Sequence, residues 1–295
     1  MNARQRAILI LIGVMSVWGS TFVVTKDLVG DLPPMTLAFA RVAIGFALLL
    51  PFAWPRYRAM LAAGQAVPWK AVFLMAFIGV TFYYGVFNLS LLYTSASQGA
   101  LVQSSIPAVT ALVAIVWLRE SAAPARLLGI ALSVIGVLVV LSGSQAGGAA
   151  PWPALGNVLM FAGVLAWGIY TSMARRLGAI DATLLTAGMM GVGGLLLLPF
   201  VVFELAGRPW PSLAFDDWLR LIFLGAGASG LGYLLYNLAL QDVDASQAGV
   251  FANLIPVVGV LSGVVLLNEP LPVQAVLGGL IVMAGVWITT TAQPS

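Results

Sequence analysis

The chain has 295 residues, of which 61% are hydrophobic and only 8% are charged, and its mean hydropathy is +1.04. Soluble domains are about 45–50% apolar and about 25% charged, so this composition excludes an ordinary cytosolic enzyme and a disordered protein. The net charge of +3 comes from 13 basic and 10 acidic residues, too few for the basic surface of a nucleic-acid-binding protein. We therefore expect an integral membrane protein that lies in a lipid bilayer and has no nucleic acid as partner.

The sequence contains neither histidine nor cysteine. Histidine is a frequent general base and metal ligand, and cysteine supplies thiolates for catalysis and metal binding. We therefore expect no zinc or thiol chemistry, no metal and no cofactor. The apolar stretch that follows residues 1–6 is too long for a cleavable signal peptide, and it predicts a first membrane span.

Runs of about 20 mostly apolar residues are long enough to cross a bilayer as helices. A transmembrane barrel would instead show alternating segments of about 10 residues. The sequence predicts an all-α protein with ten transmembrane helices and short connections. The predicted spans are residues 7–27, 34–54, 70–91, 96–118, 124–142, 153–174, 182–203, 216–238, 245–267 and 272–292.

The positions of lysine and arginine predict the orientation, because cytoplasmic loops carry an excess of both. With the N-terminus in the cytoplasm, nine basic residues fall on the inner side and three on the outer side. The outer three are Lys26, Arg208 and Arg220, and Arg41 lies inside a span. An even number of spans then places the C-terminus in the cytoplasm as well.

A shift of 149 residues aligns the two halves of the chain. It predicts two repeats of five helices each, residues 1–146 and 147–295. Because five crossings are an odd number, the second repeat would be inverted, as is typical of alternating-access transporters with a substrate site between the repeats. The alternative is a duplicated passive scaffold. The aligned pairs are Trp18 and Trp167, Trp69 and Trp218, Tyr84 and Tyr233, Asn88 and Asn237, Ser97-Gln98 and Ser246-Gln247, Pro107 and Pro256, Glu120 and Glu269, Gly129 and Gly278, and Gly136 and Gly285.

Several segments resemble the drug/metabolite transporter superfamily, in particular its EamA family. They are SVWGSTFVVTK at 16–26, FARVAIGFALLLPF at 39–52, and the paired stretches 96–120 and 245–269. The resemblance implies a ten-helix bundle that moves small metabolites across the bacterial inner membrane. Within the family the chain looks most like the YddG-type amino-acid exporters. Met190 stands where the second repeat would need a counterpart of Arg41, so no pair of arginines forms an anion site.

Polar and aromatic side chains inside the predicted spans are candidates for a substrate cavity, because polar groups in a bilayer are costly. Tyr84 and Asn88 are four residues apart and share a helix face, as do Tyr233 and Asn237. Such groups would suit an amphipathic solute, and the alternative is aromatic packing or an interfacial belt. The predicted cavity residues are Trp18, Thr21, Tyr83, Tyr84, Asn88, Gln103, Trp167, Tyr170, Tyr233, Tyr236, Asn237 and Asn253.

Pro107 and Pro256 lie inside predicted spans, where proline removes an intrahelical hydrogen bond and kinks the helix. They are candidate hinges if the repeats rock against each other. Arg41 lies about two turns from the outer end of its span. It could pair with a polar group, attract a substrate carboxylate, or extend to the interface by snorkelling.

Residues near the helix ends are predicted to have structural roles. Ser97 and Ser246 are predicted helix caps, Glu120 and Glu269 helix-end groups, and Asp216-Asp217 an N-cap rather than a metal pair. No acidic residue lies near the middle of a predicted span and no nucleotide-binding motif occurs. We therefore expect a facilitator, with coupling through a terminal carboxylate as the alternative.

Together these features predict a monomeric inner-membrane exporter of small metabolites. The expected substrates are aromatic or neutral amino acids such as Phe, Met or Thr. Alternatives are a carrier of the same fold for drugs or other metabolites, and a membrane-embedded enzyme, which would need titratable residues gathered at one membrane depth.

Overall fold

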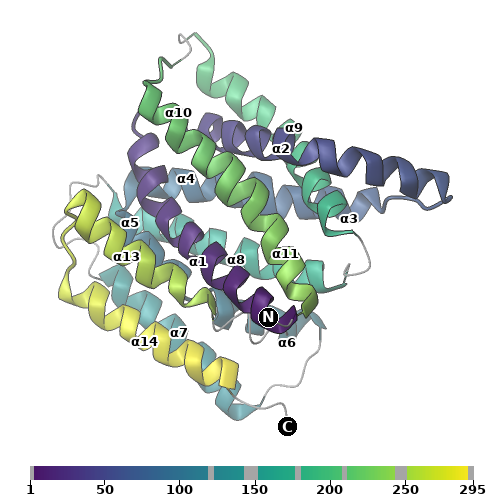
Figure 1. Cartoon of the computed structure of the whole chain (residues 1–295). Helices are drawn as coiled ribbons and strands as arrows, with labels where there is room; N and C mark the ends of the chain where they lie inside the picture. The colour runs from purple at the N-terminus through teal and green to yellow at the C-terminus, as the bar shows by residue number, and fades with distance from the viewer. Residues whose placement is uncertain are drawn as a thin grey trace.

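The computed structural model describes residues 3–118, 123–142, 152–176, 181–207, 211–242 and 251–291, and these residues form helices and no strand. The helices pack into one bundle (Figure 1). In chain order they are α1 (Ala3–Leu28), α2 (Pro34–Ala62), α3 (Trp69–Ala76), the π-helix η1 (Phe77–Phe82), α4 (Tyr83–Tyr93), α5 (Ala96–Gln103), α6 (Ile106–Leu118), α7 (Pro124–Ser142), α8 (Pro153–Arg176), α9 (Ala182–Leu205), α10 (Phe215–Ile222), the π-helix η3 (Phe223–Leu231), α11 (Gly232–Asp242), α13 (Leu254–Leu267) and α14 (Val273–Thr291).

Seven helical stretches within the described ranges are long and apolar enough to cross a membrane. Three shorter apolar helices, at 124–140, 254–267 and 273–289, lie within the predicted fifth, ninth and tenth spans. Large apolar side chains are exposed on the bundle surface, and Phe203 is 84% exposed. A multi-pass helical membrane protein is thus confirmed, while the number of crossings and the side of the termini stay predictions.

The packing of the helices follows the internal repeat. The 149-residue shift carries α7 onto the bounds of α14, and it carries α1 to within one residue of the bounds of α8 at each end. Helix α1 packs against α11 and α13, and its counterpart α8 packs against their counterparts α4 and α6. The first helix of each repeat therefore packs against the third and fourth spans of the other repeat.

Helices α2 and α9 are counterparts that pack antiparallel along their length (Figure 1). Near the end of α9, the Glu204 carboxylate accepts hydrogen bonds from the backbone N–H groups of Met35 (2.9 Å) and Thr36 (2.8 Å), at the start of α2. Near the other end, Arg56 of α2 pairs with Asp181, which caps α9. A side chain of α9 thus binds the start of α2, and a side chain of α2 pairs with the residue that caps the start of α9.

Glycines hold α7 and α14 in close antiparallel contact (Figure 1). A Cβ atom at Gly136 would lie 2.7 Å from the carbonyl oxygen of Gly278, and one at Gly285 would lie 2.5 Å from that of Gly129. Backbones at this distance leave no room for a side chain, which is the packing that small residues permit in membrane helices. The glycines shared by the two repeats therefore join these two helices.

The start of α5 is capped differently from the prediction. Ser95, not Ser97, is the N-cap, and its Oγ accepts a hydrogen bond from the backbone N–H of Gln98. The predicted cap Ser97 is wrong because its Oγ is buried and has no partner. Glu269 is confirmed as a capping group, but for another helix: its carboxylate accepts the N–H groups of Ala96 (2.7 Å) and Ser97 (2.8 Å). An anion at this position also compensates the positive end of the helix dipole.

The predicted N-cap Asp216-Asp217 is wrong, because Ala214 is the N-cap of α10 and both aspartates lie in its first turn. Asp217 reaches back from that turn and accepts the backbone N–H of Ala214 at 3.0 Å. Arg220 binds both Asp217 and Asp27. The helix-end predictions for Glu120 and Ser246 lie outside the described residues, as do Gln247 of the repeat pairs and Arg208 of the predicted outer side.

The helices that hold the two predicted kinks are interrupted rather than smoothly bent. Ser104 and Ser105 form a turn between α5 and α6, directly before Ile106 and Pro107. In the second repeat a turn at Asn253 precedes α13. The missing N–H of proline explains why the regular helix ends there. Movement about these points stays a prediction.

Candidate substrate site

Seven aromatic side chains meet where the two repeats join. We call them the aromatic cluster; they come from α1, α4, α8 and α11. Their rings contact one another with centroid distances from 5.1 to 6.3 Å. The members are Trp18, Tyr83, Tyr84, Trp167, Tyr170, Tyr233 and Tyr236.

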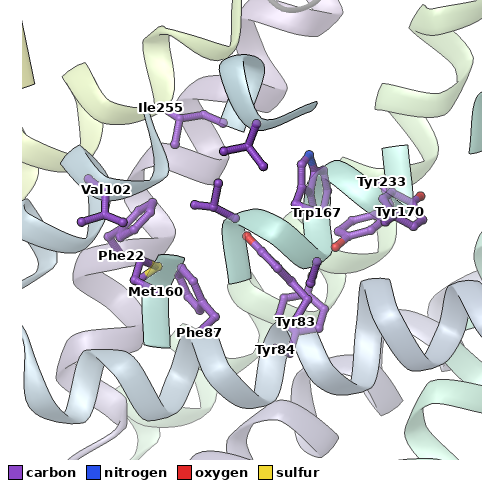
Figure 2. Packing of buried hydrophobic residues seen from close by; sticks show 14 of the residues in the cluster. Phe22, Tyr83, Tyr84, Phe87, Val102, Met160, Trp167, Tyr170, Tyr233 and Ile255 are labelled. Atoms are coloured by element: carbon purple, nitrogen blue, oxygen red, sulfur yellow. The ribbon is translucent and has the colours of Figure 1, made fainter. Parts of the chain in front are cut away.

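Five members of the cluster are shown in Figure 2, where Trp167, Tyr170 and Tyr233 lie beside one another and face Tyr83 and Tyr84. These five side chains are buried, and Tyr170 and Tyr233 are each 2% exposed. All seven were predicted as cavity residues, and the structure brings them together. It shows them packed against each other, so an open cavity at this point stays a prediction.

Two contacts in the cluster join residues that occupy equivalent positions in the repeats. Trp18 and Trp167 are 149 residues apart, and their rings meet edge to face with centroids 5.5 Å apart. Tyr84 and Tyr233 are separated by the same shift, and their centroids are 6.3 Å apart. Equivalent residues touch only near the axis that relates two repeats. The aromatic cluster therefore lies on the pseudo-two-fold axis.

Both repeats carry a π-helix beside the cluster, and the sequence analysis did not predict either one. A π-turn widens the helix and leaves carbonyl groups accessible to side chains, and such turns are frequent at functional sites. The Gly79 carbonyl of η1 accepts a hydrogen bond from Tyr233 Oη at 3.5 Å. The equivalent Ala228 carbonyl of η3 accepts one from Trp18 Nε1 at 3.0 Å. Each π-helix is thus bound to the cluster by an aromatic side chain.

Arg41 lies at the edge of the aromatic cluster and is 2% exposed. The snorkelling alternative is therefore wrong: the side chain turns into the bundle. Its Nε donates a hydrogen bond to Ser229 Oγ at 3.1 Å, and its guanidinium carbon lies 4.2 Å from the ring centroid of Tyr84. The Tyr84 hydroxyl lies 2.9 Å from the same Ser229 oxygen.

Ser229 is a site residue that sequence reasoning missed. It lies in η3, which glycines allow to approach α2 closely. A Cβ at Gly45 would lie 3.0 Å from the Gly225 carbonyl oxygen and 3.1 Å from the Gly230 nitrogen. The signal that could have revealed it is the glycine-rich stretch GAGASGLG at 225–232, which a membrane helix needs only where another backbone comes close.

The other predicted site residues have separate positions. Gln103 donates to the Tyr83 hydroxyl at 3.0 Å and so joins the cluster. Asn237 donates to Thr186 Oγ1 at 3.1 Å, and Thr21 donates back to the Trp18 carbonyl of its own helix.

Of two further predicted residues, Asn88 lies in the middle of α4 and Asn253 lies at a helix boundary. Asn88 is fully buried and donates to the Pro34 carbonyl at 3.0 Å. Asn253 lies half-buried at the turn before α13 and belongs to the helix interruption.

Polar side chains connect several helices at the end of the bundle where Glu269 caps α5. Lys26 Nζ donates to the carbonyl groups of Leu91 (2.7 Å) and Thr94 (2.8 Å) at the end of α4. Thr94 Oγ1 donates to Asn157 Oδ1 at 2.7 Å, and Asn157 donates to Gln98 Oε1 at 3.2 Å. These bonds join α1, α4, α5 and α8 at one end.

A groove of about 940 Å³ lies away from the cluster, between the end of α2 and the starts of α3 and α9. Trp54, Tyr57 and Trp69 line it, with the Arg56–Asp181 pair at one side. Within the described ranges no three acidic side chains gather as a metal site would require. The side chains gathered at the aromatic cluster offer aromatic surface, hydroxyl and amide groups, and one buried guanidinium.

Comparison with known proteins indicates a membrane transporter. The model of the EamA-like transporter family matches residues 5–142 and 154–291, which is one match in each repeat. A protein of Archaeoglobus fulgidus named as an uncharacterized transporter is 28% identical over 294 residues, 99% of both chains. A protein of Escherichia coli K12 named as a probable amino-acid metabolite efflux pump is 25% identical, over 97% of this chain and 95% of that protein.

A solved crystal structure shares the fold. It matches 96% of this chain and 94% of its own with a TM-score of 0.69 at 21% sequence identity. At that identity the likeness supports the helical architecture alone.

Proposed function

Because the chain belongs to the EamA-like transporter family, we propose that it exports small metabolites, namely amino acids with aromatic or neutral side chains. The observation that carries this proposal is the contact of Trp18 with Trp167 on the pseudo-two-fold axis. Inverted-repeat transporters bind substrate at the interface of the repeats. Here that interface offers aromatic faces with hydroxyl and amide groups, which suit an amphipathic solute. The similarity to a probable amino-acid metabolite efflux pump supports the same substrate class.

Transport would proceed by alternating access. Helices α1 and α8 each pack against the opposite repeat, so rocking of one repeat against the other would open one end of the bundle and close the other. In the predicted orientation, with both termini in the cytoplasm, the bonds of Lys26 and Glu269 lie at the outer end. The interruptions near Pro107 and Pro256 would act as hinges. The membrane is the bacterial inner membrane in this proposal, and one chain suffices.

The driving force in this proposal is the gradient of the substrate. A proton-coupled carrier would hold a titrating carboxylate close to the substrate. In the described part of the chain, the acidic side chains that form hydrogen bonds or ion pairs do so near helix ends, as Glu204 and Glu269 do. None of these bonds reaches the aromatic cluster. These positions favour facilitated transport, in which the substrate moves down its own concentration gradient.

Export of lipophilic cations is a second candidate function. Aromatic faces bind organic cations through cation–π contacts, and seven aromatic side chains gather here. The buried positive charge of Arg41 opposes this candidate, because a second cation beside it would be repelled.

Uptake into proteoliposomes tests both candidates. Purified protein would be reconstituted, and entry of labelled Phe, Met, Thr and a lipophilic cation would be compared with protein-free vesicles. The proposal expects amino acids to enter down their gradients and the cation to stay outside. Entry of the cation alone would contradict the amino-acid function and support the second candidate.

A further inference from the structure

The guanidinium of Arg41 is buried inside the bundle with part of its hydrogen-bonding capacity unused. Its Nε binds Ser229 and its carbon lies over the Tyr84 ring. Its Nη1 is buried and has no hydrogen-bond partner. An arginine that only supports the fold would be expected to satisfy its N–H groups with carbonyl or carboxylate oxygens, because an unpaired buried donor is costly.

The charge of Arg41 also has no counterion among the described residues. The described carboxylates that form ion pairs do so with other arginines: Asp181 pairs with Arg56, and Asp27 and Asp217 pair with Arg220. Glu204 and Glu269 cap α2 and α5, as shown above. A buried charge without a partner is strongly destabilising and in membrane proteins marks a functional site.

The second repeat does not duplicate this charge. The position equivalent to Arg41 holds Met190, a fully buried apolar side chain. The site therefore carries one positive charge on one side of the pseudo-two-fold axis, enough for one monovalent anionic group.

A second unpaired atom lies nearby on α4. Asn88 is fully buried, and its Oδ1 accepts no hydrogen bond, although its Nδ2 is bound to Pro34. Asn88 follows Tyr84 by four residues, which places it about 6 Å further along the same face of α4. The ring of Tyr84 is the one that stacks on Arg41. An unused donor and an unused acceptor thus flank the same tyrosine.

From these two atoms we propose that Arg41 binds the carboxylate of the transported solute and that Asn88 accepts a hydrogen bond from its amino group. The inference rests on the proposed function and narrows it to α-amino acids, whose two charged groups are attached to one carbon. The side chain of the solute would lie against the aromatic cluster. A charge-assisted hydrogen bond would give the buried charge of Arg41 its partner, and the cluster would favour solutes with aromatic or apolar side chains.

Matched ligands test this assignment on the wild-type protein. Phenylalanine, 3-phenylpropionate (carboxylate only), phenylalaninamide and phenethylamine (both without a carboxylate) share the same ring. Binding to the detergent-purified protein would be measured by calorimetry, and competition with labelled phenylalanine would be measured in proteoliposomes. Loss of one charge-assisted bond predicts that the two compounds without a carboxylate bind about 10- to 100-fold more weakly than phenylalanine.

Variants separate the two contacts. Arg41→Gln should remove the preference for compounds with a carboxylate, and Arg41→Lys should keep part of it. Asn88→Leu should reduce the advantage of phenylalanine over 3-phenylpropionate. Arg58→Gln, which removes a cation from the exposed end of the same helix, serves as the control and should bind like the wild type. The comparison of ligands uses the wild-type protein, so it still tests the proposal if one of the variants fails to fold.

The outcomes for the two proposals differ. Equal affinity for phenylalanine and phenethylamine, or no binding of any compound with a carboxylate, would overturn the role of Arg41. Binding with the expected preference but no uptake of any amino acid would retain Arg41 as the anion site and contradict the proposed transport.

Discussion

Trp18 and Trp167, which lie 149 residues apart in the sequence, meet edge to face with an interplanar angle of 82°. Each is the first-helix tryptophan of its own repeat. Their contact means that residues duplicated along the chain are brought together in space at the interface of the repeats. The proposed transport route is built around this contact, and the first prediction concerns it.

Replacement of Trp18 or Trp167 by alanine should reduce amino-acid transport by at least about tenfold. Each aromatic pair stabilises the packing by about 0.5–1.5 kcal/mol in addition to the free energy of burying its rings, and each replacement removes several pairs. Expression in the membrane should fall less than transport does. The measurement is uptake per mole of folded protein in proteoliposomes. Phe203→Ala, on the exposed surface of α9, is the matched control. Equal losses of transport and of expression would show that the tryptophans are structural.

Replacement of Gly136 by alanine should destabilise the protein by about 1–3 kcal/mol, because the new Cβ would lie 2.6–2.7 Å from α14. The fall would appear as a lower melting temperature of the detergent-purified protein. Gly13→Ala is the control, since no atom lies within 4 Å of a Cβ there. Unchanged stability of the Gly136 variant would contradict the close contact of α7 with α14.

Replacement of Glu269 by glutamine should loosen the end of the bundle where α5 begins. The charged acceptor for two backbone N–H groups would be lost, at a cost of about 0.5–2 kcal/mol. The chain has no cysteine, so a single Ser97→Cys reporter can be introduced without background. Its labelling by a membrane-impermeant maleimide should be slow, because Ser97 is buried, and faster when Glu269 is also replaced. The same labelling rate in both backgrounds would exclude Glu269 as a closing contact.

Transport should continue without a proton gradient. Vesicles loaded with unlabelled phenylalanine should accumulate labelled phenylalanine by counterflow when the pH is the same on both sides. This follows from the hydrogen bonds that Trp18, Tyr83 and Tyr233 of the aromatic cluster form, whose partners are amide and carbonyl groups. Collapse of counterflow upon addition of a protonophore would show that a carboxylate at a helix end couples transport to protons.

The sequence was sufficient to predict the helical membrane fold and the members of the aromatic cluster. The reason is the duplication: a shift that keeps Trp18 in register with Trp167 and Tyr84 with Tyr233 marks positions common to both repeats. Residues near the axis of an inverted pair are then expected to meet. Ring orientations and packing could not be predicted, since they depend on helix positions in space.

Contacts between distant segments were beyond the sequence analysis. The prediction for Ser97 was wrong because the capping serine lies two residues earlier and the N–H of Ser97 is taken by Glu269, from the other repeat. The partnership of Ser229 with Arg41 depends on a π-helix, for which single-residue propensities give no signal. Such features arise from tertiary packing.

The central claim is that two oppositely inserted repeats enclose the substrate site, and labelling of equivalent exposed positions tests it most directly. Gln65 and Ala214 are 149 residues apart, and both are exposed in connections between helices. Single-cysteine variants at these positions would be treated in intact cells with a membrane-impermeant maleimide. The account predicts that Ala214→Cys is labelled from outside and that Gln65→Cys reacts only after the cells are opened. Labelling of both from the same side would contradict the inverted repeat.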